Sequence, residues 1–426
     1  MRLAKAARDL PDLAGAVEAV LDARLLKGDP RPLAVALSGG GDSVALLLIA
    51  RDWAARAGRP LLVLSVDHRL QPESAAWTRA SGERAERLGL GFRALAWEGP
   101  KPVAGLPAAA RAARHRLLAQ AAREAGARVI LMGHTADDVL EARAMQAAGA
   151  TTPLPREWAP SPAWPEGRGI FLLRPLLGIR RAALRDWLAA RGEDWIEDPA
   201  NQDLRYARAR ARAALRPAAE ALVAAPEPAA ARLAKAARVD EAGVVTIRRA
   251  ALRGADPAAA RALLSIACLC AAGTARPPPA SRLETLRARI AAGEAFAATL
   301  AGARVEAAPD AVRLFREAGE AARGGLSPLS LAADETGVWD GRFEVRATRG
   351  ITVRALAGLA TGLSKPSRSA LRRFPAKARG GLPAILADGR LVGCPVLAPV
   401  PGAELRALAR ERLLAACGSV TSEPGG

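Results

Sequence analysis

The sequence predicts an α/β protein: a parallel sheet with helices on both faces, followed by a small helical domain and a small mixed α+β C-terminal domain. Short apolar runs alternate with segments of helical periodicity through the first 200 residues, which is typical of parallel sheets covered by helices. An Ala- and Arg-rich helical stretch follows Pro217, and strand-like runs begin near residue 302. Half of the 426 residues are apolar, so the chain can bury the cores of two or three domains.

The first half of the chain contains the elements of the expected sheet. We expect strands at 33–37, 61–67, 91–97 and 127–133, and helices at 43–57, 73–88, 106–125 and 136–147. A loop rich in Pro and Gly covers 149–169, and a strand at 171–177 and a helix at 180–191 follow it. Ligands of parallel sheets bind beyond the carboxyl ends of the strands. The polar residues directly after each strand are therefore candidates for the chemistry.

The rest of the chain divides into two smaller regions. Residues 217–300 have a helical pattern with a break at 276–281, and 304–315 and 337–347 have the pattern of β-hairpins. We therefore expect four segments along the chain. They are an N-terminal helical segment (1–30), a catalytic domain (31–217), a helical domain (218–300) and a C-terminal α+β domain (301–426).

The charge of the chain indicates a polyanionic partner. It has 62 Lys and Arg residues against 43 Asp and Glu, a formal net charge of +19. Nearly all of the cations are Arg, whose planar fork suits phosphate groups. A GC-rich genome also favours Arg over Lys, but it does not explain the surplus of bases over acids. Nucleic acid is therefore the favoured partner.

The cysteines and the apolar runs indicate a cytoplasmic protein. Cys268, Cys270, Cys394 and Cys417 form no Cys-x-x-Cys pair and have no His at metal-ligand spacing. They are expected to be buried thiols rather than disulfides. The N-terminus lacks the apolar core of a signal peptide, and no aliphatic run approaches the length of about 20 residues that a membrane span needs.

Residues 33–43 (LAVALSGGGDS) place a glycine turn between an expected strand and an expected helix. Backbone N–H groups and the helix dipole attract an anion at such a turn. No Gly-Lys-Ser/Thr follows, so this is not a Walker A loop. It resembles the loop of the PP-loop ATP pyrophosphatases, which cleave ATP between the α and β phosphates. We expect Asp42 to bind Mg²⁺, and the phosphates to bind at Ser38, Gly39, Gly40, Gly41 and Ser43.

A second polar segment follows the expected strand at 127–133. It reads MGHTADDVLEARAMQ (132–146) and contains His134, Asp137, Asp138 and Glu141. A helix places Asp137 and Glu141 on one face because they are four residues apart. Acidic residues also stabilise the first turn of a helix, so a structural role for Asp137 and Asp138 is the alternative. With the glycine loop, these acids predict a Mg²⁺–nucleotide site.

Four stretches of the chain resemble the tRNA(Ile)-lysidine synthetase family of PP-loop enzymes. They are SGGGDS (38–43), LPAAARAARHRLL (106–118), GHTADDVLEA (133–142) and EDPANQDLRYARARARAALRP (197–217). The resemblance is specific over about 31–217 and weaker in RLFRE (313–317) and WDGRF (339–343). It implies the PP-loop fold, which is similar to that of the adenine nucleotide α hydrolases, with ATP and Mg²⁺ as cofactors.

The resemblance implies a ligase that acts on the wobble cytidine of an isoleucine tRNA with a CAU anticodon. ATP adenylates the carbonyl oxygen at position 2 of the base and releases pyrophosphate. The amine of free lysine then attacks that carbon and releases AMP, which leaves lysidine. The resemblance gives catalytic roles to four residues. It assigns Asp42 and Asp137 to the ATP and metal site, and Arg111 and His134 to the surroundings of the nucleotide and the reacting base.

The resemblance also implies where lysine and tRNA bind. We expect an acidic residue to bind the lysine ammonium, and Asp137, Asp138 and Glu141 are open alternatives. An Arg-lined helix over 198–216 would bind tRNA phosphates, although it has the composition of a solvated basic helix as well. Its candidate contacts are Arg205, Arg208 and Arg212. The oligomeric state stays open, with a homodimer as one alternative.

Several positions depart from the family pattern. Val139, Ala142, Gln146 and Ala209 stand where Gln, Thr, Arg and Asn are usual. These departures weaken the expected lysine and tRNA contacts more than the ATP site. One alternative is another PP-loop adenylating RNA-modifying enzyme, such as a tRNA thiolase, although the Cys-x-x-Cys of thiolases is missing. The other is a non-catalytic basic RNA-binding relative.

Overall fold

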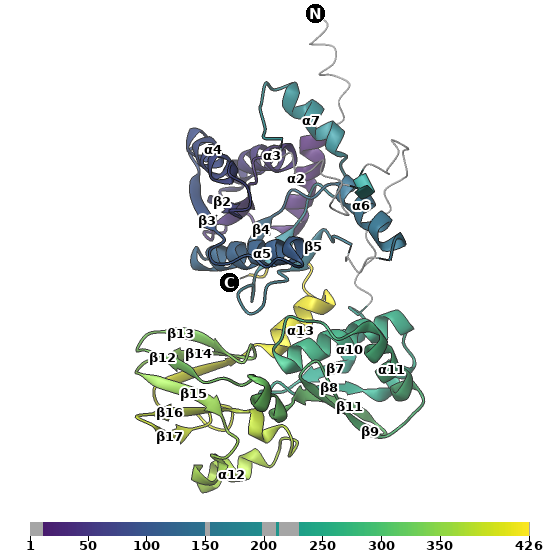
Figure 1. Cartoon of the computed structure of the whole chain (residues 1–426), viewed down its shortest axis with the longest axis vertical. Coiled ribbons are helices and arrows are strands. Elements are labelled where there is room, and N and C mark those ends of the chain that lie inside the picture. The colour runs from purple at the N-terminus through teal and green to yellow at the C-terminus, as the bar shows by residue number, and fades with distance from the viewer. Residues whose placement is uncertain (1–11, 150–153, 198–209, 213–229, 426) are drawn as a thin grey trace, which may run out of the picture. The chain divides into compact units, whose positions relative to one another are not determined.

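The computed structural model describes residues 12–149, 154–197, 210–212 and 230–425. The chain forms two compact units (Figure 1). Unit 1 comprises residues up to Pro226 together with Val420–Gly426, and unit 2 comprises Glu227–Ser419. Unit 2 is thus inserted in sequence between the main part of unit 1 and a short segment that belongs to unit 1.

Unit 1 contains the predicted parallel sheet. Its strands are β1 (Leu33–Ala36), β2 (Leu61–Asp67), β3 (Gly91–Ala96), β4 (Val129–Leu131), β5 (Trp158–Pro160) and β6 (Phe171–Leu173). They lie in the order β3-β2-β1-β4-β6-β5, and all neighbours are parallel except β5, which is antiparallel to β6. The fold class is therefore confirmed for this unit. The strand β5 lies inside 149–169, which the sequence analysis expects to be a loop.

Helices cover both faces of this sheet. They are α2 (Leu13–Arg24), α3 (Gly41–Ala57), α4 (Ser74–Arg87), α5 (Leu106–Glu124), α6 (Ala136–Ala147) and α7 (Arg181–Ala189). Successive strand residues point to opposite faces, and the two cores follow this alternation. Val35 packs in a core with α2, α3 and α7, whereas Ala34 packs in a second core with Leu118 and Ala122 of α5.

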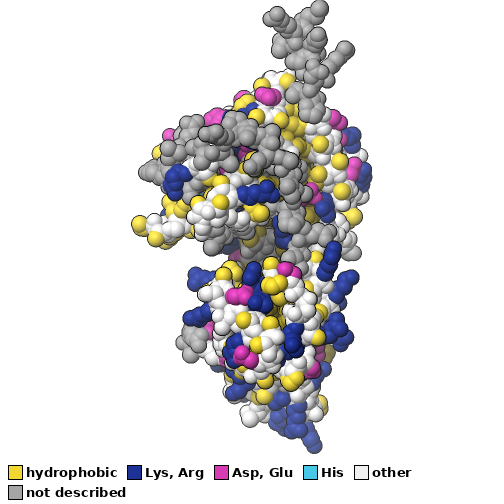
Figure 2. Space-filling view, turned by 90° about the vertical axis from the view of Figure 1, so that its right-hand side faces the viewer, with side chains coloured by type: hydrophobic (Ala, Val, Ile, Leu, Met, Phe, Trp, Pro, Cys, Tyr) yellow, Lys and Arg dark blue, Asp and Glu magenta, His cyan; other side chains and the backbone are white. Residues whose placement is uncertain are grey.

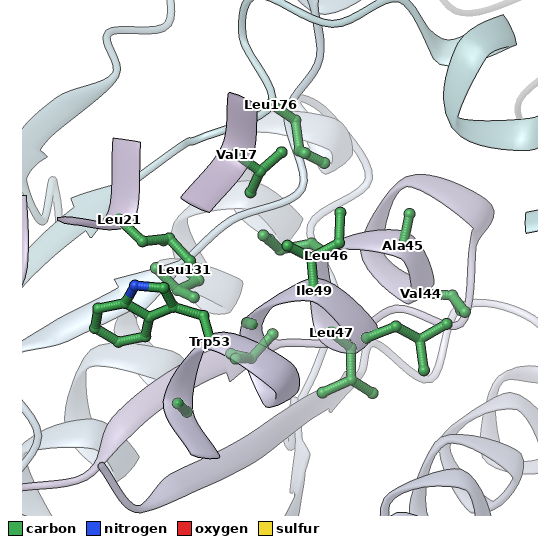
Figure 3. Close-up of a cluster of buried hydrophobic side chains, with 14 of the residues drawn as sticks. Val17, Leu21, Val44, Ala45, Leu46, Leu47, Ile49, Trp53, Leu131 and Leu176 are labelled. Carbon is green, nitrogen blue, oxygen red and sulfur yellow. The ribbon is translucent and has the colours of Figure 1, made fainter. Parts of the chain in front are cut away.

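Helix α3 is buried along most of its length. Its run Val44–Ala50 is buried on every side, and Figure 3 shows Leu46 and Ile49 of this run in one cluster with Val17 of α2 and Leu131 of β4. Trp53 Nε1 donates a hydrogen bond to Asp22 Oδ1 at 2.9 Å, which joins α3 to α2. A helix that is apolar on all sides must be central, so the glycine loop at its N-terminus has a rigid base.

Unit 2 begins with a five-stranded antiparallel sheet and helices packed on it. The strands are β7 (Ala237–Val239), β8 (Val245–Arg248), β9 (Phe296–Leu300), β10 (Ala303–Ala307) and β11 (Ala311–Arg316), in the order β7-β8-β11-β10-β9. The helices are α9 (Arg249–Arg253), α10 (Pro257–Ala272) and α11 (Ala280–Ala291). Because three strands lie before residue 301, the stretch 218–300 is not purely helical. A domain boundary at residue 300 would divide this sheet.

The rest of unit 2 consists of two small sheets and two helices. One sheet has the order β12 (Leu329–Leu331), β15 (Ile351–Ala355), β16 (Pro383–Ala387), β17 (Arg390–Gly393). The other has the order β13 (Thr336–Trp339), β14 (Phe343–Ala347), β18 (Ala403–Ala407), and the helices are α12 (Lys365–Leu371) and α13 (Ala409–Cys417). Both predicted hairpins are present, as the antiparallel pairs β10–β11 and β13–β14.

Two sequence expectations can be compared with the described residues directly. All four cysteines are buried and form no disulfide, as expected for thiols in apolar surroundings. Within the described ranges, every helix is too short or too polar to span a bilayer.

Candidate active site

A cavity of about 1010 Å³ opens at the carboxyl ends of the parallel strands in unit 1. Its wall includes Leu37 after β1, Val66 of β2 and His134 after β4. The strand order reverses direction between β1 and β4, and ligands of doubly wound sheets bind at such a point. The loops after these two strands are the glycine loop and the start of α6, so the topology brings the two predicted motifs together.

The glycine loop is held by hydrogen bonds among its own residues. Ser43 Oγ accepts a hydrogen bond from the Ser38 N–H at 3.2 Å, lies 3.1 Å from Ser38 Oγ, and donates to the Gly40 carbonyl at 2.9 Å. Helix α3 begins at Gly41, and the N–H groups of Ser43 and Val44 donate to the Gly40 carbonyl at 3.0 and 3.1 Å. The positive end of the helix dipole lies at this turn, which can attract an anion.

At two glycines in and beside this loop, neighbouring atoms lie so close that a side chain could not be added without movement. Gly39 has φ +83°, and a Cβ there would lie 2.5 Å from Ile196 Cδ1. Gly133, after β4, approaches the start of α3 so closely that a Cβ would lie 3.1 Å from Ser43 N and Cα. A side chain at either position would push the loop away from its neighbours.

Asp42 of the glycine loop is bound by an arginine that the sequence analysis did not select. Arg181 Nε donates to Asp42 Oδ2 at 2.9 Å. Burial raises the pKa of Asp42, and Arg181 opposes that rise. Burial lowers the pKa of Arg181, but Asp42, Asp138 and Glu141 outweigh it and raise that pKa overall. Arg181 therefore stays a cation at any working pH.

The two neighbouring acids at the start of α6 have different surroundings. Asp138 lines the cavity and forms a capping box, because its Oδ2 accepts from the Thr135 N–H at 2.7 Å and from Thr135 Oγ1 at 3.0 Å. Asp137 contacts α7 instead. It accepts from Arg180 Nε at 3.2 Å and from the Arg181 backbone N–H at 2.8 Å. Asp137 is not among the described residues that line the cavity.

Glu141 is buried behind the cavity wall and paired with two arginines. Its Oε1 accepts from Arg212 Nε at 2.7 Å and lies 3.4 Å from Arg181 Nη1. The Glu141 side chain is 1% exposed. A buried carboxylate needs such partners, because leaving it unpaired would cost several kcal/mol. Arg212 lines the cavity, so the pair connects the buried acid to the wall.

His134 lies on the cavity wall with one ring nitrogen fixed. Arg174, which directly follows β6, donates from Nε to His134 Nδ1 at 3.3 Å. Because Nδ1 accepts, the neutral imidazole carries its proton on Nε2. Arg174 also donates to the Arg156 carbonyl at 2.8 Å and is buried. Burial and three neighbouring arginines lower the pKa of Arg174 to about 10, which still leaves it charged at pH 7.

Helix α5 adds positive charge to this part of the site. Arg114 lines the cavity, whereas Arg111, one turn earlier, is exposed and does not. Both lie close enough to lower the pKa of Arg174. Arg111 was expected near the nucleotide and the reacting base. Of the two arginines, Arg114 is the one that lines the cavity.

The cavity wall also has apolar side chains. They include Leu70, Trp77 and Leu106. His68 follows β2 there, with its ring edge-on to Trp97 at a centroid distance of 6.2 Å. Burial is the main cause that lowers the pKa of His68 below its usual value.

The structure therefore brings most of the predicted site together. Of the predicted residues, the cavity is lined by Ser38, Gly40, Gly41, Asp42, Ser43, His134, Asp138 and Arg212. The other described members of the predicted set do not line it; they are Gly39, Arg111, Asp137 and Glu141. Arg205 and Arg208 lie outside the described residues, as does Ala209 among the departures.

Some residues of the site were not selected from the sequence, although they also lie beyond the carboxyl end of a strand. Arg174 directly follows β6, and Arg181 begins the helix after that strand, so both lie beyond a strand's carboxyl end. Arg185 and Glu197 also line the wall and form an ion pair at 2.8 Å. Applied to the expected strand at 171–177, the rule points to Arg180 and Arg181 but not to Arg174, because Arg174 lies inside that expected strand and follows only the shorter strand of the structure.

The donor set of the site fits a magnesium ion that arrives with phosphate. Asp42 and Asp138 are close enough for Asp138 to raise the pKa of Asp42. In the described ranges no cluster of three or more His, Cys, Asp or Glu side chains could hold a metal alone. Mg²⁺ commonly uses one or two carboxylates plus substrate phosphates, so this pair is sufficient only when phosphate oxygens complete the shell.

Comparisons with known proteins agree with this geometry. The family model of the PP-loop domain matches residues 15–219. The tRNA(Ile)-lysidine synthase of Caulobacter vibrioides is 48% identical over 96% of this chain and 98% of its own length. That of Hyphomonas neptunium is 37% identical over 68% of this chain and 82% of its own. Among solved structures, the U34-tRNA thiolase NcsA from Methanococcus maripaludis is 16% identical, covers 47% of this chain and 69% of its own, and has a TM-score of 0.39.

Proposed function

Because the chain belongs to the tRNA(Ile)-lysidine synthase family, we propose that the cavity of unit 1 is where it activates the wobble cytidine of tRNA(Ile) with ATP and joins it to lysine. The chain is an ATP-using ligase of tRNA. The observation that supports this location is the meeting of the glycine loop, the start of α6 and the cationic wall in one cavity. We further propose that it works in the cytoplasm, as the absence of disulfides among its four cysteines suggests.

The phosphates of ATP would bind at the glycine loop. The N-terminus of α3 lies there, and the Ser38 and Ser43 hydroxyls hold the loop in shape by bonding to each other and to the Gly40 carbonyl. We assign the metal to Asp42 and Asp138, and not to Asp137, because Asp137 is used by α7. Bound there, Mg²⁺ would neutralise charge that develops on the phosphates.

The basic wall would stabilise the reacting groups. In the first step the base oxygen attacks the α phosphate and pyrophosphate leaves; in the second, lysine attacks the ring carbon and AMP leaves. Arg114 and Arg185 lie on the wall, where fixed cations stabilise the charge of both leaving groups. His134, with its proton on Nε2, is a hydrogen-bond donor to an anionic oxygen rather than a base.

The lysine ammonium requires a carboxylate near the base. The three alternatives from the sequence are narrowed by their contacts. Asp137 is held by Arg180, and Glu141 is buried and held by Arg181 and Arg212, whereas Asp138 lies on the wall. We therefore propose Asp138 as the lysine contact, since its two carboxylate oxygens can serve the metal and the ammonium separately. The departures Val139 and Ala142 are buried, so neither side chain is suited to reach the substrate.

The tRNA would be held by arginines of both units. We propose that Arg205, Arg208 and Arg212 contact phosphates, and that unit 2 adds further contacts. Figure 2 shows Lys and Arg side chains (dark blue) over the surface of unit 2. On α12 and the turn after it they are Lys365, Arg368, Arg372, Arg373 and Lys377. Each phosphate contact removed should reduce the salt dependence of tRNA binding by about one unit of log–log slope.

A direct test supplies the full-length protein with ATP, Mg²⁺, labelled lysine and a tRNA(Ile) transcript with a CAU anticodon. We expect label to be fixed in the tRNA, and to be lost when the wobble cytidine is changed. Pyrophosphate release without fixed label would contradict the assignment of lysine as the nucleophile. If neither product formed, the ligase assignment itself would be wrong.

Two variants of α3 test the phosphate site. Asp42→Asn should abolish pyrophosphate release while tRNA binding stays within about threefold, because the tRNA contacts lie elsewhere. Asp52→Asn is the matched control, since Asp52 is on the same helix but exposed and paired with Arg51. Loss of tRNA binding in folded Asp42→Asn protein would contradict this division of roles.

A further inference from the structure

One guanidinium group is shared by three carboxylates at the edge of the cavity. Arg181 lies 2.9 Å from Asp42 Oδ2 through Nε, 3.7 Å from Asp138 Oδ2 through Nη2 and 3.4 Å from Glu141 Oε1 through Nη1. Its side chain is 17% exposed, and those of the three acids are 20%, 10% and 1% exposed. Each nitrogen of the fork therefore faces a different acid.

The backbone of Arg181 is fixed independently of its side chain. Arg181 is the first residue of α7, and its N–H donates to Asp137 Oδ2 at 2.8 Å. Arg180 adds two hydrogen bonds to the same carboxylate, at 3.2 and 3.1 Å. The start of α7 is therefore held to α6, and the guanidinium is delivered to Asp42 and Asp138 by a rigid support. Such pre-positioning reduces the entropy lost when the ion pairs form.

The location of Arg181 overlaps with the proposed metal site. Asp42 and Asp138 are the two carboxylates on the wall that suit Mg²⁺, and both face Arg181. A divalent cation and a guanidinium cannot use the same carboxylate oxygens fully, since both are attracted by the same charge. Occupation by Arg181 therefore weakens any metal site made of the carboxylates alone.

We propose that Arg181 is an internal counter-ion that prevents these carboxylates from binding a divalent cation before the nucleotide arrives. This proposal rests on the proposed function only in that the metal enters with ATP. Phosphate bound at the glycine loop lies in the same cavity as Arg181. Its oxygens attract the guanidinium and add ligands for the metal. Nucleotide thus both draws Arg181 away from Asp42 and completes the metal site, which makes Arg181 a positioning residue.

The test measures Mn²⁺ binding to the full-length protein by electron paramagnetic resonance, without ATP, lysine or tRNA. Arg181→Gln should bind Mn²⁺ at least about tenfold more tightly than the unchanged protein, because removing one positive charge leaves the acids free for metal. Arg181→Lys, which keeps a cation, should stay close to the unchanged protein. Arg116→Gln is the control, as Arg116 is exposed on α5 and does not line the cavity; it should leave Mn²⁺ binding unaltered.

A second measurement adds a non-cleavable ATP analogue. In the unchanged protein the analogue should strengthen Mn²⁺ binding about tenfold or more, because phosphate oxygens complete the shell. In Arg181→Gln the part of that gain that comes from displacing the guanidinium should already be present without nucleotide, so the analogue should strengthen Mn²⁺ binding less than in the unchanged protein. The double variant Arg181→Gln/Asp42→Asn should lose it, which locates the bound Mn²⁺ at Asp42.

The proposal can be tested whether the Arg181→Gln variant is folded or unfolded in the absence of metal. If the variant is folded and binds Mn²⁺ no more tightly than the unchanged protein, the proposal is overturned. If it is unfolded without metal because the acids repel one another, millimolar Mn²⁺ should fold it; failure to do so also overturns the proposal. Neither result depends on lysidine formation, so an error in the proposed reaction would be seen separately.

Discussion

At the scale of single residues, His134 and His115 show how position decides what a histidine can do. His134 lies on the cavity wall and receives a hydrogen bond from Arg174. His115 is buried on α5, and neither ring nitrogen has a hydrogen-bond partner in the described structure. Burial, with help from nearby arginines, lowers the pKa of His115 to about 2. One ring lines the cavity, and the other is part of the core.

The bond from Arg174 leads to a prediction about catalysis. Arg174→Met removes the donor that keeps the proton of His134 on Nε2, so the imidazole no longer has a fixed donor direction. We expect kcat for lysidine formation to fall about tenfold or more, while KM for ATP changes little. Arg116→Met is the control, because Arg116 is exposed on α5. Equal losses in the two variants would show that Arg174 has no specific role.

The burial of His115 predicts a pH dependence of stability. Its folded pKa of about 2 lies below the unfolded value of 6.5, so the unfolded chain binds a proton that the folded chain does not. The contribution of His115 to the free energy of unfolding is therefore fully present well above pH 6.5, and it is lost as the pH falls through that value. Between pH 7.5 and 5.5 the loss should be about 1.4 kcal/mol. His115→Leu should remove that part of the pH dependence, measured by urea unfolding at both pH values.

At the scale of elements, much of the sheet could be predicted and the shortest elements could not. Helices and strands with a clear apolar period, such as α3 and β2, lie where the sequence places them. The strand β5 was missed because its three residues end in Pro160, within a loop-like composition. Pro is tolerated there because β5 is at the edge of the sheet. In unit 2, Ala- and Arg-rich composition concealed β7 and β8 in the same way.

The acids of α6 show how far spacing arguments reach. Asp137 and Glu141 do share a helix face, as their spacing predicts, since both contact Arg181. Periodicity could not tell that this face meets α7, because that depends on tertiary packing between distant segments. The acidic helix could therefore be predicted from the sequence. Which of Asp137 and Asp138 lines the cavity could not.

This difference in surroundings predicts different effects of two neighbouring substitutions. Asp137→Asn keeps an oxygen for the Arg181 N–H and should lower the rate of pyrophosphate release by less than about tenfold. Asp138→Asn removes a charge from the proposed metal pair and should lower it by about 100-fold or more. Pyrophosphate release in the presence of tRNA measures both. The reverse order of effects would assign the metal to Asp137 after all.

At the scale of the whole molecule, two buried ion networks connect segments that are distant in sequence. In unit 2, Asp340 accepts from Arg316 at 2.8 and 2.9 Å and from Arg342 at 2.7 Å. These residues belong to the RLFRE and WDGRF stretches, so the two motifs that the resemblance selected meet in space. Their contact joins β11 to the β13–β14 hairpin. The sequence alone gave the motifs but no reason for them to meet.

In unit 1, the segment after Ser419 is bound to the start of the catalytic fold. Glu423 lies 2.6 Å from Arg59, and both side chains are fully buried. Glu423 also accepts from the Leu26 N–H at 3.1 Å, and its own N–H donates to the Arg24 carbonyl at 2.8 Å. Trp158 Nε1 donates to the Val420 carbonyl at 2.9 Å. Residues 420–425 therefore complete the surface of unit 1 rather than extend unit 2.

The buried pair predicts that a substitution near residue 423 destabilises a domain that begins some 400 residues earlier. Glu423→Gln leaves the Arg59 charge buried without its partner, so unit 1 should lose about 3–5 kcal/mol of unfolding free energy. Glu18→Gln, which breaks the more exposed pair with Arg56, should cost less than about 1 kcal/mol. Tryptophan emission during urea unfolding follows unit 1 selectively, because Trp339 is the single tryptophan of unit 2.

A double-variant cycle separates the pair from the packing around it. Arg59→Met/Glu423→Leu removes both charges, so its loss should be smaller than the sum of the two single losses, in which one charge stays unpaired. Some loss should remain, since Arg59 also donates to the carbonyls of Leu26 and Arg31 at 3.0 and 2.9 Å. Strictly additive losses would mean that the two side chains stabilise unit 1 independently. Coupled losses would establish residues 420–425 as an integral part of the unit that contains the active site.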